Sequence, residues 1–282
     1  MKLHSLVTRS LFRQSAPVVA VLRLSGVLGG FGPFPRGLTL AGVASGIERA
    51  FSMRGVRAVA LSINSPGGSA VQAALIYKRV RVLAAEKDVK VYTFAEDVAA
   101  SGGYWLACAG DEIFAHECSI IGSIGVITAS FGFDEAITRL GIARRVHTAG
   151  DKKKMLDPFL PEDPVEVARL KTIQSDIHDS FKGLVRERRR GRLVADEAEV
   201  FTGEFWTGRR AKELGFVDGI GDLRSVMRAR YGDKVKLRLI GAPRPWLRRR
   251  LGVEGVAVSP ADWASALLWE LEARSLWSRY GL

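Results

Sequence analysis

The chain has 282 residues, 47% of them hydrophobic, which is enough for one large buried core and excludes a disordered chain. Its net charge of +12 directs attention to anionic partners. The two cysteines, Cys108 and Cys118, do not suggest a disulfide framework and have no zinc-ligand spacing. We therefore expect a reducing compartment, two buried thiols, and neither a metal nor a cofactor.

Arginine is concentrated in two segments, 186–192 and 244–250. The first segment has few aromatic neighbours, so it offers no platform on which nucleic-acid bases could stack. A solvated basic face and contact with an anionic membrane surface both remain open interpretations. Nucleic acid is the least favoured partner.

The N-terminal part of the chain predicts neither a membrane span nor a secretory signal. Its longest apolar stretch, residues 16–31, is interrupted by Arg23 and contains several glycines, whereas a span needs roughly 20 apolar residues. Residues 1–15 form a basic segment, either a short amphipathic helix or a frayed terminus. We expect a cytoplasmic protein, with peripheral attachment to the inner face of the membrane as the alternative.

Strands and helices alternate in the first part of the chain. Valine-rich segments at 18–24, 56–63 and 89–94 predict strands, and the apolar spacing of 39–51 and 70–86 predicts helices between them. In the second helix we expect Val71, Leu75, Val82 and Leu83 to be buried. This alternation predicts an α/β fold with a largely parallel sheet.

Shorter elements follow, and then a change of character. We expect helices at 104–109, 133–140 and 161–190 and short strands at 113–115 and 120–127. The long helix is predicted from the helical spacing of its apolar residues, Val165, Ala168, Ile173, Ile177, Phe181 and Val185. We expect residues 226–282 to form a helical C-terminal arm with an apolar stripe at Trp263, Leu267, Leu268 and Leu271. The arm could pack on its own domain, dock on a second subunit or lie on a membrane.

Two glycine turns, 67–68 and 102–103, follow predicted strands and precede predicted helices. Ligands of parallel sheets bind at the carboxyl ends of the strands, so both turns should lie at one edge of the sheet. Ser101 precedes the second turn, where a hydroxyl can be exposed beside a free backbone N–H, as a nucleophile requires. The alternative is a serine that caps the following helix.

A serine nucleophile needs a base, and none of the four histidines lies in a motif that points to Ser101. A lysine can serve only when it is neutral, which burial or neighbouring cations favour. Lys152, Lys153 and Lys154 are adjacent, and apolar residues follow them. An exposed basic loop is the competing interpretation of this segment.

Several motifs, in this order, resemble the serine peptidase family typified by signal peptide peptidase A, in a short single-domain form. The matching segments are 64–68 (NSPGG), 100–104 (ASGGY), 122–126 (GSIGV), Lys153 before 157–159 (DPF), and 203–211 (GEFWTGRRA). The resemblance implies a ClpP/crotonase-like fold and places the peptidase domain at about residues 16–225. It also implies a homo-oligomer, a tetramer or octamer, that cleaves extended apolar peptides such as cleaved signal peptides.

The resemblance also implies roles for single residues. Ser101 matches the nucleophile and Lys153 the general base of a Ser-Lys dyad. Ser123 matches the serine that orients the lysine, and the backbone N–H groups of Gly68 and Gly102 match the oxyanion hole.

Two alternatives of other classes use the same fold. One is a crotonase-type enzyme that acts on acyl-coenzyme A, for which Glu96 or Asp97 would be the carboxylate base. The other is a scaffold that binds apolar peptides without cleaving them.

Overall fold

A largely parallel sheet organises the chain. The computed structural model describes residues 16–30, 37–241, 270–271 and 273–282. The strands are β1 (Val18–Ser25), β2 (Val56–Ser65), β3 (Lys90–Ala100), β4 (Glu112–Ala115), β5 (Ile120–Gly122), β6 (Phe205–Thr207), β7 (Gly219–Ile220) and β8 (Lys236–Leu239). Their order is β6-β5-β3-β2-β1-β8, with β4 beside β3 and β7 beside β4; only the β5–β6 pair is antiparallel. The α/β class with a largely parallel sheet is confirmed.

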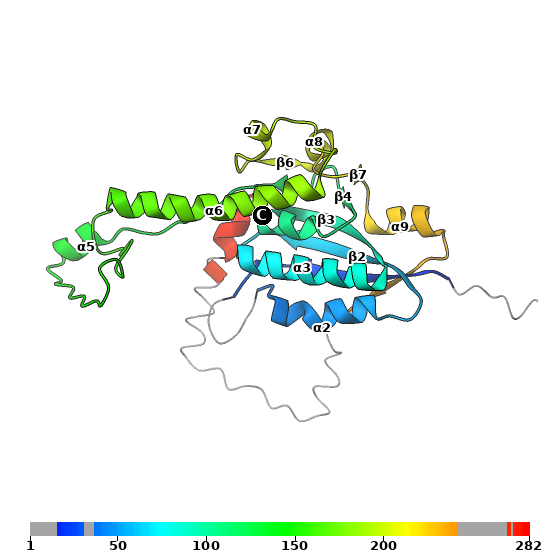
Figure 1. Ribbon diagram of the computed structural model, residues 1–282, viewed down its shortest axis with the longest axis horizontal. Helices are drawn as coiled ribbons and strands as arrows, with labels where there is room; N and C mark the ends of the chain where they lie inside the picture. Colours follow the sequence, from blue (N-terminus) through cyan, green and yellow to red (C-terminus); the bar gives the residue numbers. More distant parts are fainter. Residues whose placement is uncertain (1–15, 31–36, 242–269, 272) are drawn as a thin grey trace, which may run out of the picture.

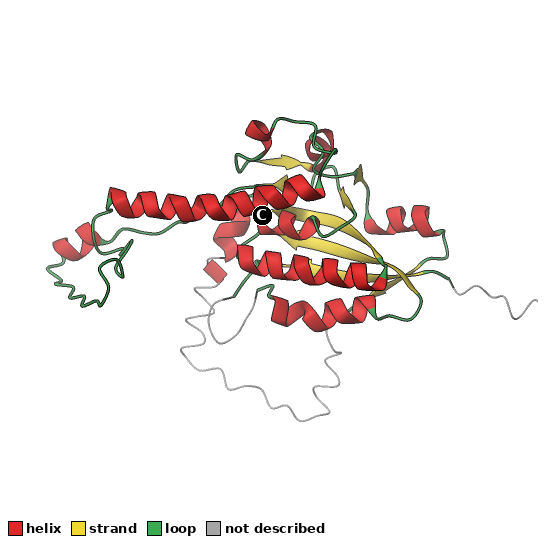
Figure 2. Cartoon of the chain, in the orientation of Figure 1, coloured by secondary structure: helices red, strands yellow, loops and turns green. Residues whose placement is uncertain are grey.

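Helices lie on both faces of the sheet (Figures 1 and 2). They are α2 (Leu40–Phe51), α3 (Ala70–Lys87), α4 (Gly102–Ala107), α5 (Asp134–Arg139), α6 (Pro164–Arg188), α7 (Glu197–Val200), α8 (Gly208–Glu213) and α9 (Leu223–Tyr231). The main core joins α2, α3, α4 and the C-terminal half of α6 to one face. A smaller core on the other face packs Met227 of α9 against Tyr92, Phe94 and Phe114.

The buried face predicted for α3 was largely wrong. Val71 is 65% exposed, and Leu75 and Val82 are also exposed, whereas Ala73, Ile76 and Val80 are buried together with Leu83. Both sets have helical spacing, because α3 carries apolar side chains on more than one side. The structure buries the stripe that contains the small side chain of Ala73, which lies in the main core.

The long helix is present as α6, and its apolar stripe is buried only in the second half. Phe181 and Val185 are buried, but Val165 is 67% exposed and Ile173 is also exposed. Figure 1 shows the reason, since the N-terminal half of α6 extends beyond the sheet together with α5. Apolar side chains on this half therefore have no core to enter within the described chain.

The sheet continues past residue 225, where the first domain was expected to end. That boundary falls inside α9, and β8 pairs with β1 in parallel. Residues 273–278 form a helix at the C-terminus. The basic segment 1–15, the arginine segment 244–250, and Trp263, Leu267 and Leu268 of the arm lie outside the described residues. Among the helices that the described residues form, none has both the length and the apolar composition of a membrane span.

The first arginine segment is mainly structural rather than a basic face. Arg189 is 1% exposed and donates hydrogen bonds to the carbonyl of Gly215 and to Asp218. Arg188 donates to the carbonyls of Cys108 and Gly110. These contacts join the C-terminal end of α6 to the loops around the sheet, so the charge is used inside the fold.

Replacing Arg189 with leucine should destabilise the fold strongly, because the Gly215 carbonyl would lose two donors and the largely buried Asp218 would keep only Arg192 as an ion-pair partner. Loss of one partner of a buried ion pair costs about 3–5 kcal/mol. Denaturant unfolding of the full chain measures this change. Arg190→Leu is the matched control, since Arg190 is exposed and should change the unfolding free energy by less than about 0.5 kcal/mol. Equal effects of the two substitutions would contradict a structural role for Arg189.

Candidate active site

Ser101 lies where β3 turns into α4. Its backbone has φ 52° and ψ −124°, a left-handed conformation that a serine rarely adopts, and its N–H donates to the carbonyl of Gly122 at 2.8 Å. Ser101 occupies the N-cap position of α4, but its side chain makes no capping hydrogen bond. The hydroxyl is therefore not used to cap the helix, and the alternative of a capping serine is not supported.

The glycine turn after β2 packs directly against Ser101. A Cβ atom on Gly67 would lie 2.7 Å from the Cβ and 3.0 Å from the Oγ of Ser101, so only a glycine fits there. The two glycine turns therefore meet at one edge of the sheet, as the sequence predicted. This contact comes from the parallel pairing of β2 with β3.

Ser123 stands beside Ser101 because of strand register. Ala100 of β3 is paired with Gly122 of β5, and the next residue on each strand is a serine with positive φ, 52° and 54°. Ser123 is buried, its N–H donates to the carbonyl of Glu204, and it lines the same cavity as Ser101. The structure thus brings together the two serines that the resemblance singles out.

Gly68 and Gly102 also line this cavity. No hydrogen bond is assigned to either N–H among the described residues, so both donors are available. A Cβ on Gly68 would lie 2.3 Å from the carbonyl oxygen of Leu28, and one on Gly102 would lie 2.7 Å from the Leu28 side chain. Close packing against Leu28 accordingly holds both backbones in place.

The cavity around Ser101 has a volume of about 910 Å³, and its walls combine apolar side chains with hydroxyl and other polar groups. Trp105 of α4 stacks on Phe181 of α6 with the ring centroids 4.9 Å apart, and Leu28 and Ile177 add further apolar surface. No carboxylate lines it among the described residues. Its aromatic and aliphatic side chains offer a packing surface to apolar groups of a ligand.

His178 also lines the cavity, which sequence reasoning missed. Its Nε2 lies 3.0 Å from the carbonyl oxygen of Ile124, so this nitrogen carries the proton and donates it. His178 thereby holds the backbone next to Ser123. The signal was present in the helical spacing of Ile177, His178 and Phe181, which share one face of α6.

Lys153 does not lie in the Ser101 cavity. It is exposed in the loop between α5 and α6, and Figure 1 shows this loop beyond the N-terminal end of α6. From Ile177, which lines the cavity, α6 runs roughly 20 Å to its first residue, Pro164. Lys152 and Lys154 are exposed in the same loop. Within one chain, the structure does not bring any of the three lysines to Ser101.

The DPF motif that follows these lysines braces their loop. Asp157 forms an ion pair with Arg144, whose guanidinium lies over the Phe159 ring at 4.7 Å from the ring centroid. The hydrogen bond from Arg144 and one from the Phe159 N–H hold the pKa of Asp157 below its usual range. Phe159 in turn packs on Phe133 at the start of α5. These contacts fix the loop that presents Lys153.

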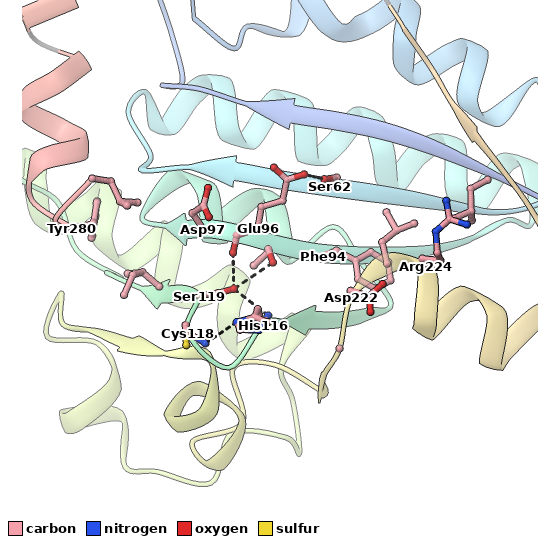
Figure 3. A pocket seen from close by; sticks show the side chains of 16 residues that line it. Ser62, Phe94, Glu96, Asp97, His116, Cys118, Ser119, Asp222, Arg224 and Tyr280 are labelled. Carbon is pink, nitrogen blue, oxygen red and sulfur yellow. Dashed lines mark hydrogen bonds between the residues drawn. The ribbon is translucent and has the colours of Figure 1, made fainter.

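A second cavity, of about 750 Å³, lies on the other side of β3 (Figure 3). Glu96 and Asp97, the carboxylates considered for a crotonase-type reaction, line this cavity and not the one with Ser101. Glu96 accepts hydrogen bonds from Ser62 and Arg23, and Asp97 accepts one from Asn64 at 2.8 Å. Neither carboxylate is placed to act near the available N–H groups.

The cysteines differ from expectation in one case. Cys108 is buried in the main core, and burial raises the pKa of its thiol to about 12. Cys118 is exposed, because it lies in the turn between β4 and β5. The prediction of two buried thiols was therefore wrong for Cys118.

Comparisons with known proteins identify a peptidase family. Residues 84–236, more than half of the chain, match the family described as Peptidase family S49. A putative protease from Synechocystis is 32% identical over 216 residues, which cover 73% of this chain and 75% of that protein. The chloroplastic serine protease SPPA of Arabidopsis thaliana is 29% identical over 197 residues, 67% of this chain and 28% of that protein.

One relative is named as an ion transporter and not as a protease. A Brucella abortus protein named Na(+)/H(+) antiporter NhaA is 49% identical over 280 residues, which cover 96% of this chain. The chain spans only 38% of the length of that protein. Among solved structures, a membrane-bound stomatin-specific protease, in a mutant form, aligns with 81% of this chain and 99% of its own at 16% identity and a TM-score of 0.49.

The left-handed backbone of Ser101 predicts a stability difference between two small substitutions. Ser101→Gly relieves the backbone strain, whereas Ser101→Ala keeps it, so the glycine variant should be the more stable by about 1 kcal/mol. Thermal or denaturant unfolding of both variants measures the difference. A glycine variant that is less stable than the alanine variant would show that the conformation is not strained.

Proposed function

Because the chain belongs to peptidase family S49, we propose that it is a serine endopeptidase in which Ser101 attacks the carbonyl carbon of a peptide bond. The single observation that carries this proposal is the uncommitted Ser101 hydroxyl on a left-handed turn, in one cavity with Gly68, Gly102 and Ser123. The aromatic and aliphatic side chains in the cavity, among them Trp105 and Phe181, support an extended apolar peptide as the substrate.

In the proposed reaction a neutral lysine takes the proton of Ser101 as the hydroxyl attacks. The N–H groups of Gly68 and Gly102 stabilise the oxyanion, an effect worth about 2.7–4 kcal/mol per donor in other serine enzymes. The lysine then gives the proton to the leaving amine. Water next attacks the acyl-enzyme and completes the hydrolysis.

We assign the base to Lys153 of a second copy of the chain. Its own chain holds Lys153 beyond the end of α6, roughly 20 Å along the helix from the cavity. The segment that carries it, residues 127–163, exposes several large apolar side chains: Ile127, Phe131, Phe133, Leu140, Ile142, Val146 and Leu160. Apolar surface of this extent favours contact with another subunit. A ring of such contacts, in a tetramer or octamer, would complete every site.

The other interpretations receive less support. A crotonase-type reaction lacks a carboxylate in the Ser101 cavity among the described residues. The antiporter name of the Brucella relative belongs to a protein of which this chain spans 38%, so we do not transfer it. A fluorophosphonate probe distinguishes a peptidase from a non-catalytic scaffold. For a peptidase, the probe should label the parent chain and leave Ser101→Ala unlabelled.

Mixing two inactive variants tests the shared site. Ser101→Ala and Lys153→Ala should each lower the cleavage of an apolar peptide by at least about a thousandfold. When the two are unfolded together and refolded, random assembly should restore about a quarter of the parent activity, since one site in four pairs an intact serine with an intact lysine.

Two control variants test whether Lys153 or another residue is the general base. Lys152→Ala changes a neighbouring exposed lysine and should keep the parent activity. His178→Gln removes the histidine of the same cavity while Lys153 stays intact. An active Lys153→Ala variant together with an inactive His178→Gln variant would overturn the assignment of the lysine. Absence of recovery in the mixture would contradict a site shared between chains.

A further inference from the structure

The side chain of Arg279 brings a full positive charge to the cavity that holds Ser101. Among the described residues that line this cavity, Arg279 is the only lysine or arginine, and none is an aspartate or a glutamate. Arg279 is exposed and forms no ion pair with a described residue. By contrast, Arg274 on the C-terminal helix that precedes Arg279 is paired with Glu270 at 3.3 Å. Within the described part of the chain the guanidinium of Arg279 has no carboxylate partner, so it can meet one from outside.

Arg279 lies in the turn that directly follows the C-terminal helix, and this end of the chain is anchored to the edge of the sheet that holds Ser101. Tyr280 packs its ring edge-on against Phe205 of β6, with centroids 5.0 Å apart, and its hydroxyl donates to the carbonyl of Pro66 at 3.5 Å. Pro66 belongs to the turn that contains Gly67 and Gly68. Leu276, one turn earlier on the helix, also lines the cavity. Figure 1 shows this helix in red between α6 and α3, whose residues form the neighbouring walls.

Filling the cavity changes the surroundings of this charge. An apolar peptide in the cavity displaces water from the walls and from one side of the guanidinium. A charge that loses water without gaining a partner is destabilised, whereas a carboxylate restores the lost interactions through two parallel hydrogen bonds. The cavity thus favours a ligand that is apolar along its length and carries a carboxylate near Arg279.

We infer that Arg279 binds a carboxylate of the peptide substrate, and that it thereby makes this site selective for apolar peptides with a negative charge close to the scissile bond. The inference rests on the proposed peptidase function and adds a specificity residue to it. The carboxylate can be the free α-carboxylate of a short peptide or the side chain of Asp or Glu. In the first case the scissile bond lies close to a C-terminus, which is either the natural end of a polypeptide or an end made by an earlier proteolytic cut.

The test compares matched peptides on the full chain. A nested set with one apolar sequence ends two, four or six residues after the scissile bond, and each member is made as the free acid and as the carboxamide. A third version is a carboxamide with one glutamate in place of an uncharged residue at the same distance. At the best length we expect kcat/KM for the acid to exceed that for the carboxamide by about fivefold at low salt, and the ratio to fall as salt is added. Recovery by the glutamate peptide would show that a side-chain carboxylate also serves.

Two variants assign the effect to Arg279. Arg279→Gln should bring the acid-to-carboxamide ratio close to one, and Arg279→Lys should keep part of it. Arg274→Gln removes the same charge five residues earlier, from a residue that does not line the cavity, and should keep the parent ratio. An equal loss in Arg274→Gln would overturn the inference, since it would point to attraction by the whole basic surface.

Failure of the inference can be told apart from failure of the proposed function. If the parent cleaves the acid and the carboxamide equally at every length, Arg279 is not a specificity residue although the chain is a peptidase. If the parent cleaves neither and the fluorophosphonate probe does not label it, the peptidase proposal fails. In that case the acid and carboxamide peptides, each with a fluorescent label, still test Arg279 through their binding to Ser101→Ala, which fluorescence anisotropy measures. Equal dissociation constants for acid and carboxamide would then overturn it.

Discussion

The pairing of Ala100 with Gly122 in neighbouring parallel strands is the constraint on which the candidate active site depends. Each strand ends one residue later in a serine with positive φ, so the register alone sets Ser101 and Ser123 side by side. A shift of one residue would turn one of these side chains to the other face of the sheet. The backbone of Gly67 closes the third side of the arrangement and tolerates no side chain. Backbone geometry, rather than hydrogen bonds between side chains, holds this site together.

Burial divides the charged residues of the chain into two kinds. Arg188 and Arg189 are committed to carbonyl groups and to Asp218, and they connect α6 to the rest of the fold. Arg279 and Lys153 are both exposed. Arg279 lies at the Ser101 cavity, and Lys153 lies on the loop beyond the N-terminal end of α6. Formal net charge therefore says little about function here, because partners inside the fold decide which charges remain available to a ligand.

Much of the fold was predictable from local pattern. Valine-rich runs identified β1, β2 and β3, and Thr39 marked the start of α2, where its side chain accepts a hydrogen bond from the Gly42 N–H. Predictions failed where two patterns were equally periodic. On α3 the stripe with Val71 and the stripe with Ala73 both have helical spacing, and only packing against the sheet chooses between them. The exposed first half of α6 could not be foreseen either, since periodicity does not reveal where a sheet ends.

The sequence by itself determined the strand-turn-helix units, the glycine turns at one edge of the sheet, and the position of Ser101 between a strand and a helix. These are local properties, fixed by side-chain period and by the backbone conformations that glycine permits. The tertiary structure alone decided that Ser123 neighbours Ser101, that His178 and Arg279 share their cavity, and that Glu96 and Asp97 face another one. It also separated Lys153 from the Ser101 cavity by the first half of α6. Contacts between distant residues depend on strand register and helix direction, which no short segment of sequence contains.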